Sequence, residues 1–185
     1  YRKGAVVMYA LKDAIGEDAV NRALRRFIDR WAFVETGFPR TGDLIALFRE
    51  EAGPEHQRLI TDLFEEISLW DLKVTEATTR VLEDGRHEVE AVVEVAMFHA
   101  DGEGNETPVD TDVTLDLAVF PASSGELGRY ELPPAIHRER ARLSSGEHRF
   151  TFVVEEAPAR VGIDPFAKLI DRVPADNLKA VDEAD

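Results

Sequence analysis

The sequence of 185 residues contains no cysteine, which excludes disulfide bonds and thiolate metal ligands. It also lacks long hydrophobic runs, because no stretch approaches the roughly 18–20 apolar residues of a membrane-crossing helix. No signal-peptide pattern is present. We therefore expect a soluble polypeptide that does not itself insert into a membrane.

Positive charge is scarce, since 22 Lys and Arg residues face 37 Asp and Glu residues and the formal net charge is −15. Nucleic-acid phosphates are bound mainly by Lys and Arg, so this balance argues against a nucleic-acid partner. It disfavours an anionic membrane surface for the same reason. Hydrophobic residues make up 44% of the chain, which is enough for a packed core and argues against global disorder.

Recognisable catalytic and cofactor motifs are also missing. The chain has no Gly-x-Ser-x-Gly nucleophile elbow, no P-loop and no dinucleotide fingerprint. A His-Glu-x-x-His zinc helix cannot be formed, because no two histidines lie four residues apart. We therefore expect no metal or other cofactor bound by this chain alone. The histidines are His56, His87, His99, His137 and His148.

Apolar residues in the first third recur with the 3.6-residue period of helices. They predict four helices, over residues 5–15, 20–31, 44–51 and 59–67. Gly16 is expected to end the first helix, and Thr41 to cap the third. Tyr9 is interpreted as a core residue of the first helix. The apolar face of the second helix is predicted to consist of Val20, Ala23, Leu24, Phe27, Ile28 and Trp31.

The apolar period changes from 3.6 to 2 at Leu69-Trp70, which predicts strands. Apolar residues then alternate with acidic ones between turns such as Asp84-Gly85-Arg86, a pattern typical of an antiparallel sandwich. The predicted fold class is α+β, with a helical layer of about four helices followed by an antiparallel β-sandwich. The predicted domains are residues 1–68 and 69–185, and residues 181–185 are expected to be a frayed tail.

The N-terminal residues carry a family resemblance. Tyr1-Arg2-Lys3-Gly4-Ala5 is followed by an apolar helix, then by Ala14-Ile15-Gly16-Glu17 and a second helix. This order resembles the zinc-dependent aminopeptidase N (membrane alanyl aminopeptidase) family just after its metal site. It extends from Tyr1 to about Ile67. The resemblance implies that Tyr1 is catalytic, donating a phenol hydrogen bond to the oxyanion that forms when water attacks the scissile carbonyl.

The zinc ligands of that family lie upstream of this motif and have no counterpart here. We therefore expect the chain to be the C-terminal part of a longer parent, as its start directly at a helix without an initiator Met also suggests. Residues 1–68 would then be the helical end of the catalytic domain. The parent would hold zinc through ligands outside this chain and remove N-terminal residues from peptides. The fragment alone would be inactive.

A narrower resemblance involves residues 63–72 and 162–172. Both segments are similar to the end of bacterial proteins that join transporter-permease-like membrane helices to an aminopeptidase-like domain. This implies a parent in the bacterial inner membrane, an upstream catalytic domain as partner in cis, and peptide substrates bound through the parent. A surface exposed by truncation is expected to allow a homodimer.

Two alternatives remain open. The chain could be a non-catalytic scaffold or interaction module of a transporter-associated protein. It could also be an unrelated α+β binding domain in which the match around Tyr1 is due to chance. An intact His-Glu-x-x-His in the upstream sequence would support the enzyme over the module.

Three further patterns have a structural and a functional interpretation. Residues 101–112 place oxygens as in a calcium loop, but Glu106 replaces the required glycine, so a solvated hairpin tip is favoured. Arg138, Arg140 and Arg142 would share one face of a strand. They could contact the acidic sandwich, a catalytic domain or a peptide carboxylate, and a charge-protected edge strand is the favoured interpretation. His99 is interpreted as a hydrogen-bonded histidine at the edge of the core.

Overall fold

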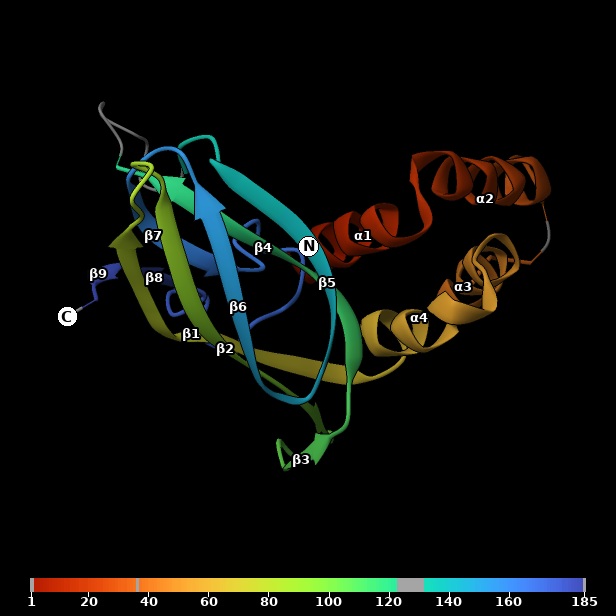
Figure 1. Ribbon diagram of the computed structural model, residues 1–185. Coiled ribbons are helices and arrows are strands. Elements are labelled where there is room, and N and C mark those ends of the chain that lie inside the picture. Colours follow the sequence, from red (N-terminus) through yellow and green to blue (C-terminus); the bar gives the residue numbers. More distant parts are fainter. Residues whose placement is uncertain (1, 36, 123–131, 185) are drawn as a thin grey trace. The chain divides into compact units, whose positions relative to one another are not determined.

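The computed structural model describes residues 2–35, 37–122 and 132–184, and the side chains from Lys3 onward within those ranges (Figure 1). The chain divides into two units. The first consists of the residues up to Ser68 together with the short segments His99–Asn105 and Lys168–Ile170, and the second contains the rest. Helices come first and sheets of mainly antiparallel strands follow, which confirms the predicted α+β class.

The helical unit is built from α1 (Arg2–Ile15), α2 (Glu17–Trp31), α3 (Thr41–Glu51) and α4 (Gln57–Phe64). A 3₁₀ turn over Pro54–His56 leads into α4. Gly16 alone separates α1 from α2 and has a φ of 88°, a left-handed conformation that favours glycine. The predicted end of the first helix at Gly16 is thus confirmed.

The buried faces of α1 and α2 follow the predicted spacing, with two exceptions. Val7 and Leu11 of α1 and Ala23 of α2 are buried, as helical periodicity requires. Tyr9, however, is about half exposed, because it lies between the positions that face inward. Ile28, predicted on the apolar face of α2, is 60% exposed. These two core predictions were wrong.

The ends of α3 and α4 also differ from the predictions. Thr41 is the first helical residue of α3 rather than its cap. Arg40 precedes the helix, and its backbone N–H donates to Asp43 Oδ2 at 2.7 Å. Asp43 therefore satisfies a free N–H at the helix start, as a carboxylate at the third helical position does in a capping box. The helix α4 ends at Phe64, before the predicted end at residue 67, because Ile67 already begins the first strand.

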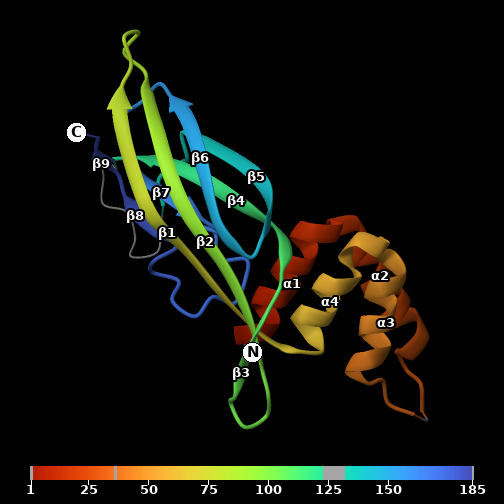
Figure 2. The same ribbon diagram turned by 60° about the horizontal axis from the view of Figure 1, so that its bottom comes forward.

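The second unit contains two sheets (Figure 2). In one sheet β3, β2, β1 and β9 lie in that order, and β6 also pairs with β2. The other has the order β5-β4-β7-β8. The bounds are β1 (Ile67–Val81), β2 (His87–Ala100), β3 (Glu106–Val109), β4 (Asp112–Pro121), β5 (His137–Ser144), β6 (Gly146–Val154), β7 (Pro158–Ile163), β8 (Leu178–Ala180) and β9 (Asp182–Glu183).

The core of the second unit lies between the two sheets, which face each other as in a sandwich (Figures 1 and 2). Apolar residues at alternate positions of the long strands β1 and β2 are buried, because successive side chains of a strand point to opposite faces. From one sheet come Val89 and Val93, and from the other Leu117 and Val161, all fully buried.

The C-terminal tail is ordered into both sheets, so the prediction of a frayed tail was wrong for residues 181–184. Val181 N–H donates to the Ala159 carbonyl, and Ala184 N–H donates to the Thr79 carbonyl. β9 pairs with β1 in parallel, opposite Thr78 and Thr79. Backbone hydrogen bonds to distant strands fix this segment, and these have no signature in the local sequence.

No helix within the described part of the chain combines the length and the apolar character needed to cross a membrane.

Candidate functional site

Tyr1, the predicted catalytic residue, lies outside the described residues. The structure describes the backbone that follows it. α1 begins at Arg2, so Lys3 and Gly4 of the motif lie in its first turn. A Cβ placed on Gly4 would have no described atom within 4 Å. Packing within the described residues therefore does not require a glycine at this position.

The described residues do not form a zinc site. Nowhere in residues 2–35, 37–122 and 132–184 do three His, Asp or Glu side chains come together as metal ligands. Tetrahedral zinc sites in enzymes use three protein ligands and an open position. The residues that the structure describes bring no such set of ligands together.

The helical unit contains one Asp–His pair, formed by Asp62 of α4 and His99. Asp62 is buried, and its Oδ1 lies 3.2 Å from His99 Nε2. Arg58, one helical turn before Asp62, donates from Nε to Asp62 Oδ2 at 3.1 Å. The Arg58 Nη2 atom is also 3.3 Å from His99 Nε2. The Asp62 carboxyl thus has a guanidinium and an imidazole as partners. These contacts offset the free-energy cost of burying this polar group.

This cluster resembles the base–orienter half of a catalytic triad, but no described serine or threonine hydroxyl is hydrogen-bonded to His99. Asp62 orients the ring, and its role in the described structure is to tie residue 99 to α4. His99 is a hydrogen-bonded histidine, as its interpretation from the sequence stated. The partner Asp62 was missed, although its i, i+4 spacing from Arg58 was a visible signal.

A second buried ion pair joins Asp13 of α1 to Lys168. The Lys168 Nζ atom donates to Asp13 Oδ1 at 2.7 Å, across 155 residues of sequence. Lys168 is nearly fully buried. A buried ammonium requires a compensating partner, so this pair holds the segment Lys168–Ile170 against the helical unit. Sequence reasoning could not find it, because nothing local relates the two positions.

The arginines of β5 pair with aspartates of the neighbouring strand β4. The Arg138 guanidinium donates from Nε and Nη2 to Asp116 Oδ1 at 3.1 and 3.0 Å. Arg142 donates to both carboxylate oxygens of Asp112 at 2.8 Å. The pKa of Asp112 is lowered by this hydrogen bond to Arg142. β5 lies at the edge of the β5-β4-β7-β8 sheet, which confirms the favoured interpretation of an edge strand. Contact with the acidic sandwich itself is also observed for these two arginines.

The Asp171 side chain links strand β1 to the segment that follows Asp171. Its Oδ2 accepts from Leu72 N–H at 2.8 Å, and its Oδ1 accepts from Val173 N–H at 2.6 Å. Burial raises the pKa of the Asp171 carboxyl, although these two backbone hydrogen bonds oppose the shift. The next residue, Arg172, pairs with Glu106 and lies over the Phe98 ring at 4.8 Å.

We expect Asp171→Asn to change how stability depends on pH. A carboxyl whose folded pKa is raised stabilises the fold fully below its unfolded pKa. That contribution is lost as pH rises through the folded value. The unfolding free energy of the variant minus that of the wild type should therefore increase from acidic to neutral pH. Urea unfolding across this range measures it, and a pH-independent difference would contradict the assignment.

The calcium-like segment is a hairpin tip, as favoured from the sequence. Asp101 Oδ1 accepts from the backbone N–H groups of Glu103 and Asn105, both at 2.9 Å. Its Oδ2 accepts from the Asn105 side chain at 2.8 Å. The pKa of Asp101 is lowered, mainly by that side-chain hydrogen bond. The loop thus uses the Asp101 oxygens for its own closure.

A shallow cavity of about 240 Å³ lies on the outer face of the first sheet. Its charged residues are two glutamates and an arginine from three neighbouring strands. This depression is smaller than the roughly 300–1,000 Å³ of sites for drug-sized ligands. Its lining consists of Glu76, Thr78, Glu90, Ala91, Val92, Arg149, Phe150 and Thr151.

Comparison of the chain with models of known protein families and with curated proteins finds no match. Any functional assignment therefore depends on the sequence pattern that begins at Tyr1 and on the geometry described above.

Proposed function

We propose that this chain is the C-terminal part of a zinc aminopeptidase-like protein, and that the parent removes N-terminal residues from peptides. The observation that supports it is the order Tyr1-Arg2-Lys3-Gly4-Ala5, apolar helix, Gly16, second helix. That order coincides with α1 and α2 and with the left-handed glycine between them. The zinc ligands in this proposal lie outside the chain.

The contribution of the chain would be the Tyr1 phenol as a hydrogen-bond donor to the developing oxyanion, with the helices behind it as support. Placement in the bacterial inner membrane, through segments outside this chain, is part of the same proposal. It rests on the similarity of residues 63–72 and 162–172 to permease-fused proteins. The upstream catalytic domain would be the partner in cis.

In the parent, we expect Tyr1→Phe to lower kcat for an alanyl peptide by about 100-fold or more, the usual cost of removing one oxyanion donor. The substitution removes only a hydroxyl, so zinc content and thermal unfolding should not change. Gly42→Ala is a matched control, because a Cβ at Gly42 would contact no described atom and the residue lies outside the motif.

Zinc content and hydrolysis should be measured on this chain and on the parent together. An inert chain beside a zinc-loaded, active parent that is sensitive to Tyr1→Phe supports the proposal. A zinc-loaded parent whose kcat is unaffected by Tyr1→Phe refutes the role of Tyr1. A parent that is zinc-free and inactive refutes the enzyme.

The second candidate is a non-catalytic interaction module, favoured by one observation. The helical unit exposes four large apolar side chains over a short stretch, Ile28, Phe33, Val34 and Phe38. Apolar clusters of this kind mark interaction surfaces more often than single exposed residues do. The zinc measurement on the parent separates this candidate from the first.

A further inference from the structure

The end of α2 and the connection to α3 carry an exposed apolar cluster, which we call the α2–α3 patch. It consists of Ile28, Phe33, Val34 and Phe38. Phe33 is fully exposed (103%), and Phe38 is 90% exposed. The connection lies at one end of the α2–α3 helix pair (Figures 1 and 2). The two phenylalanine rings receive almost no packing from the described part of the chain, whereas Ile28 and Val34 are partly covered.

Both the backbone conformation and the solvent exposure of Phe33 are unfavourable. Its φ is 61°, in the left-handed region that a bulky non-glycine residue rarely adopts. Its ring is also surrounded by solvent, so no described contact within the chain compensates for the backbone conformation. Backbone strain of this kind concentrates at functional surfaces. A compensating contact with another molecule would account for both features.

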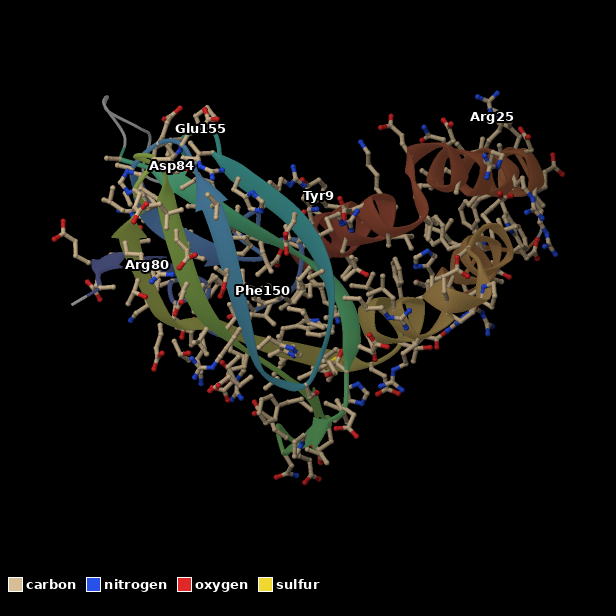
Figure 3. The ribbon with its side chains drawn as sticks, viewed as in Figure 1. Tyr9, Arg25, Arg80, Asp84, Phe150 and Glu155 are labelled. Carbon is tan, nitrogen blue, oxygen red and sulfur yellow. The ribbon has the colours of Figure 1, made fainter. Side chains whose placement is uncertain are left out.

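The charges around the patch carry both signs. Arg25, Arg30 and Arg40 are exposed, and Figure 3 shows Arg25 pointing away from α2. Asp29 and Glu35 are exposed beside them. None of these five side chains has an ion-pair partner among the described residues, although the Arg30 guanidinium lies 5.3 Å from the centre of the Trp31 ring. By contrast, Arg22 and Arg26 are already paired with Glu50 and Glu51 of α3.

From these observations we propose that the α2–α3 patch is the interface of a two-fold homodimer of this chain. A two-fold interface places the same surface on both sides, so it must be complementary to itself. Apolar rings can pack on apolar rings, and the arginines of one copy can face Asp29 and Glu35 of the other. Aromatic residues and arginine are also the types enriched at interface centres.

The area is sufficient for a weak dimer. Two exposed phenylalanines with Ile28 and Val34 offer on the order of 500 Å² per copy, since a phenylalanine buries about 150–250 Å². The charged rim brings the area toward the roughly 800 Å² per partner of standard interfaces. We therefore expect dissociation in the micromolar range. The proposal does not depend on the parent being an enzyme.

An anionic bilayer fits the patch less well. Three arginines would be attracted to lipid headgroups, but Asp29 and Glu35 would be repelled from the same surface. The chain as a whole is strongly acidic, with a formal net charge of −15. A second copy of the chain can pair with both the arginines and the acidic side chains around the patch, whereas an anionic bilayer can pair only with the arginines. Charge complementarity thus favours the homodimer.

Sedimentation velocity over about 1–100 µM tests the proposal, because a micromolar equilibrium shifts within that range. The wild type is expected to move from monomer to dimer. The double variant Phe33→Ser/Phe38→Ser should stay monomeric with unchanged circular dichroism. Val81→Ser, which alters an exposed valine of β1, is the matched control and should dimerise normally.

Disulfide trapping identifies the surface, since the chain has no cysteine of its own. Under mild oxidation, Val34→Cys should form covalent dimers much faster than Val81→Cys, because the apolar side chains of the two copies meet in the proposed interface. Dimerisation that is lost in the Phe variant and trapped through residue 34 supports the proposal. A wild type that is monomeric throughout, or a dimer that survives the double substitution, overturns it. A monomer that floats with anionic vesicles through Phe33 and Phe38 overturns it in favour of a lipid surface.

Discussion

Replacing Arg138 with methionine is expected to lower the free energy of unfolding by about 2 kcal/mol, because a hydrogen bond to a charged group contributes roughly 1.5–3 kcal/mol and half of the Arg138 side chain lies in solvent. Asp116 is 1% exposed and accepts from Nε and Nη2 of this arginine. Without the guanidinium, the buried Asp116 carboxyl loses two hydrogen bonds to its Oδ1 atom, although other contacts of Asp116 remain. The variant also loses the contact of Arg138 with the Phe166 ring, at 4.6 Å.

Arg142→Met is the matched control for this prediction. It breaks the corresponding pair between the same two strands, but Arg142 and Asp112 are both largely exposed. Exposed pairs contribute at most about 1 kcal/mol, so the control should differ little from the wild type. The double variant Asp116→Leu/Arg138→Met also removes the buried carboxyl group that has lost these hydrogen bonds, and it should recover part of the loss. Equal effects of Arg138→Met and Arg142→Met in urea unfolding would contradict this account.

Gly162→Val is expected to destabilise the second unit by about 3 kcal/mol, because overpacking of a close backbone approach costs of that order. A Cβ at Gly162 would lie 2.8 Å from Leu178 Cδ2 and 2.9 Å from Pro165 Cβ. Leu178 Cδ2 is the end of a flexible side chain, but Pro165 Cβ belongs to a rigid ring, so the backbone near Pro165 must also shift. Movement of side chains alone therefore cannot remove these close contacts.

Gly102→Val provides the comparison, since a Cβ there meets nothing within 4 Å and the residue lies in the exposed hairpin tip. Its effect should stay within about 0.5 kcal/mol, as for most surface substitutions. Thermal and urea unfolding of both variants measure the difference. If valine at 162 is tolerated as well as valine at 102, the packing of β7 against β8 is looser than described.

Local periodicity predicted most of the fold. Helical spacing located all four helices, and alternation located the long strands, because burial of one face imposes a period on the sequence. Two of the failures come from the tertiary environment. Ile28 satisfies the helical period but is mostly exposed, and Asp182 was predicted to lie in a frayed tail but pairs with β1.

The candidate site was less predictable than the fold. Tyr1 came from a family resemblance, and its position is outside the described residues, so its role stays a prediction. The pairs Asp62–His99 and Asp13–Lys168 join residues 37 and 155 positions apart. Only the folded chain brings such partners together, whereas Arg138 and Asp116 could be suspected from opposite charges on neighbouring strands.

The ion pair between Asp13 and Lys168 has a consequence for biosynthesis. N-terminal segments generally begin to fold while the ribosome is still translating. Here α1 carries a carboxylate whose buried partner is synthesised 155 residues later. The helical unit can thus begin to assemble early, but it gains this ion pair only when residue 168 has emerged. A premature stop before residue 168 would remove this contact of the first helix, even though every helical residue had been made.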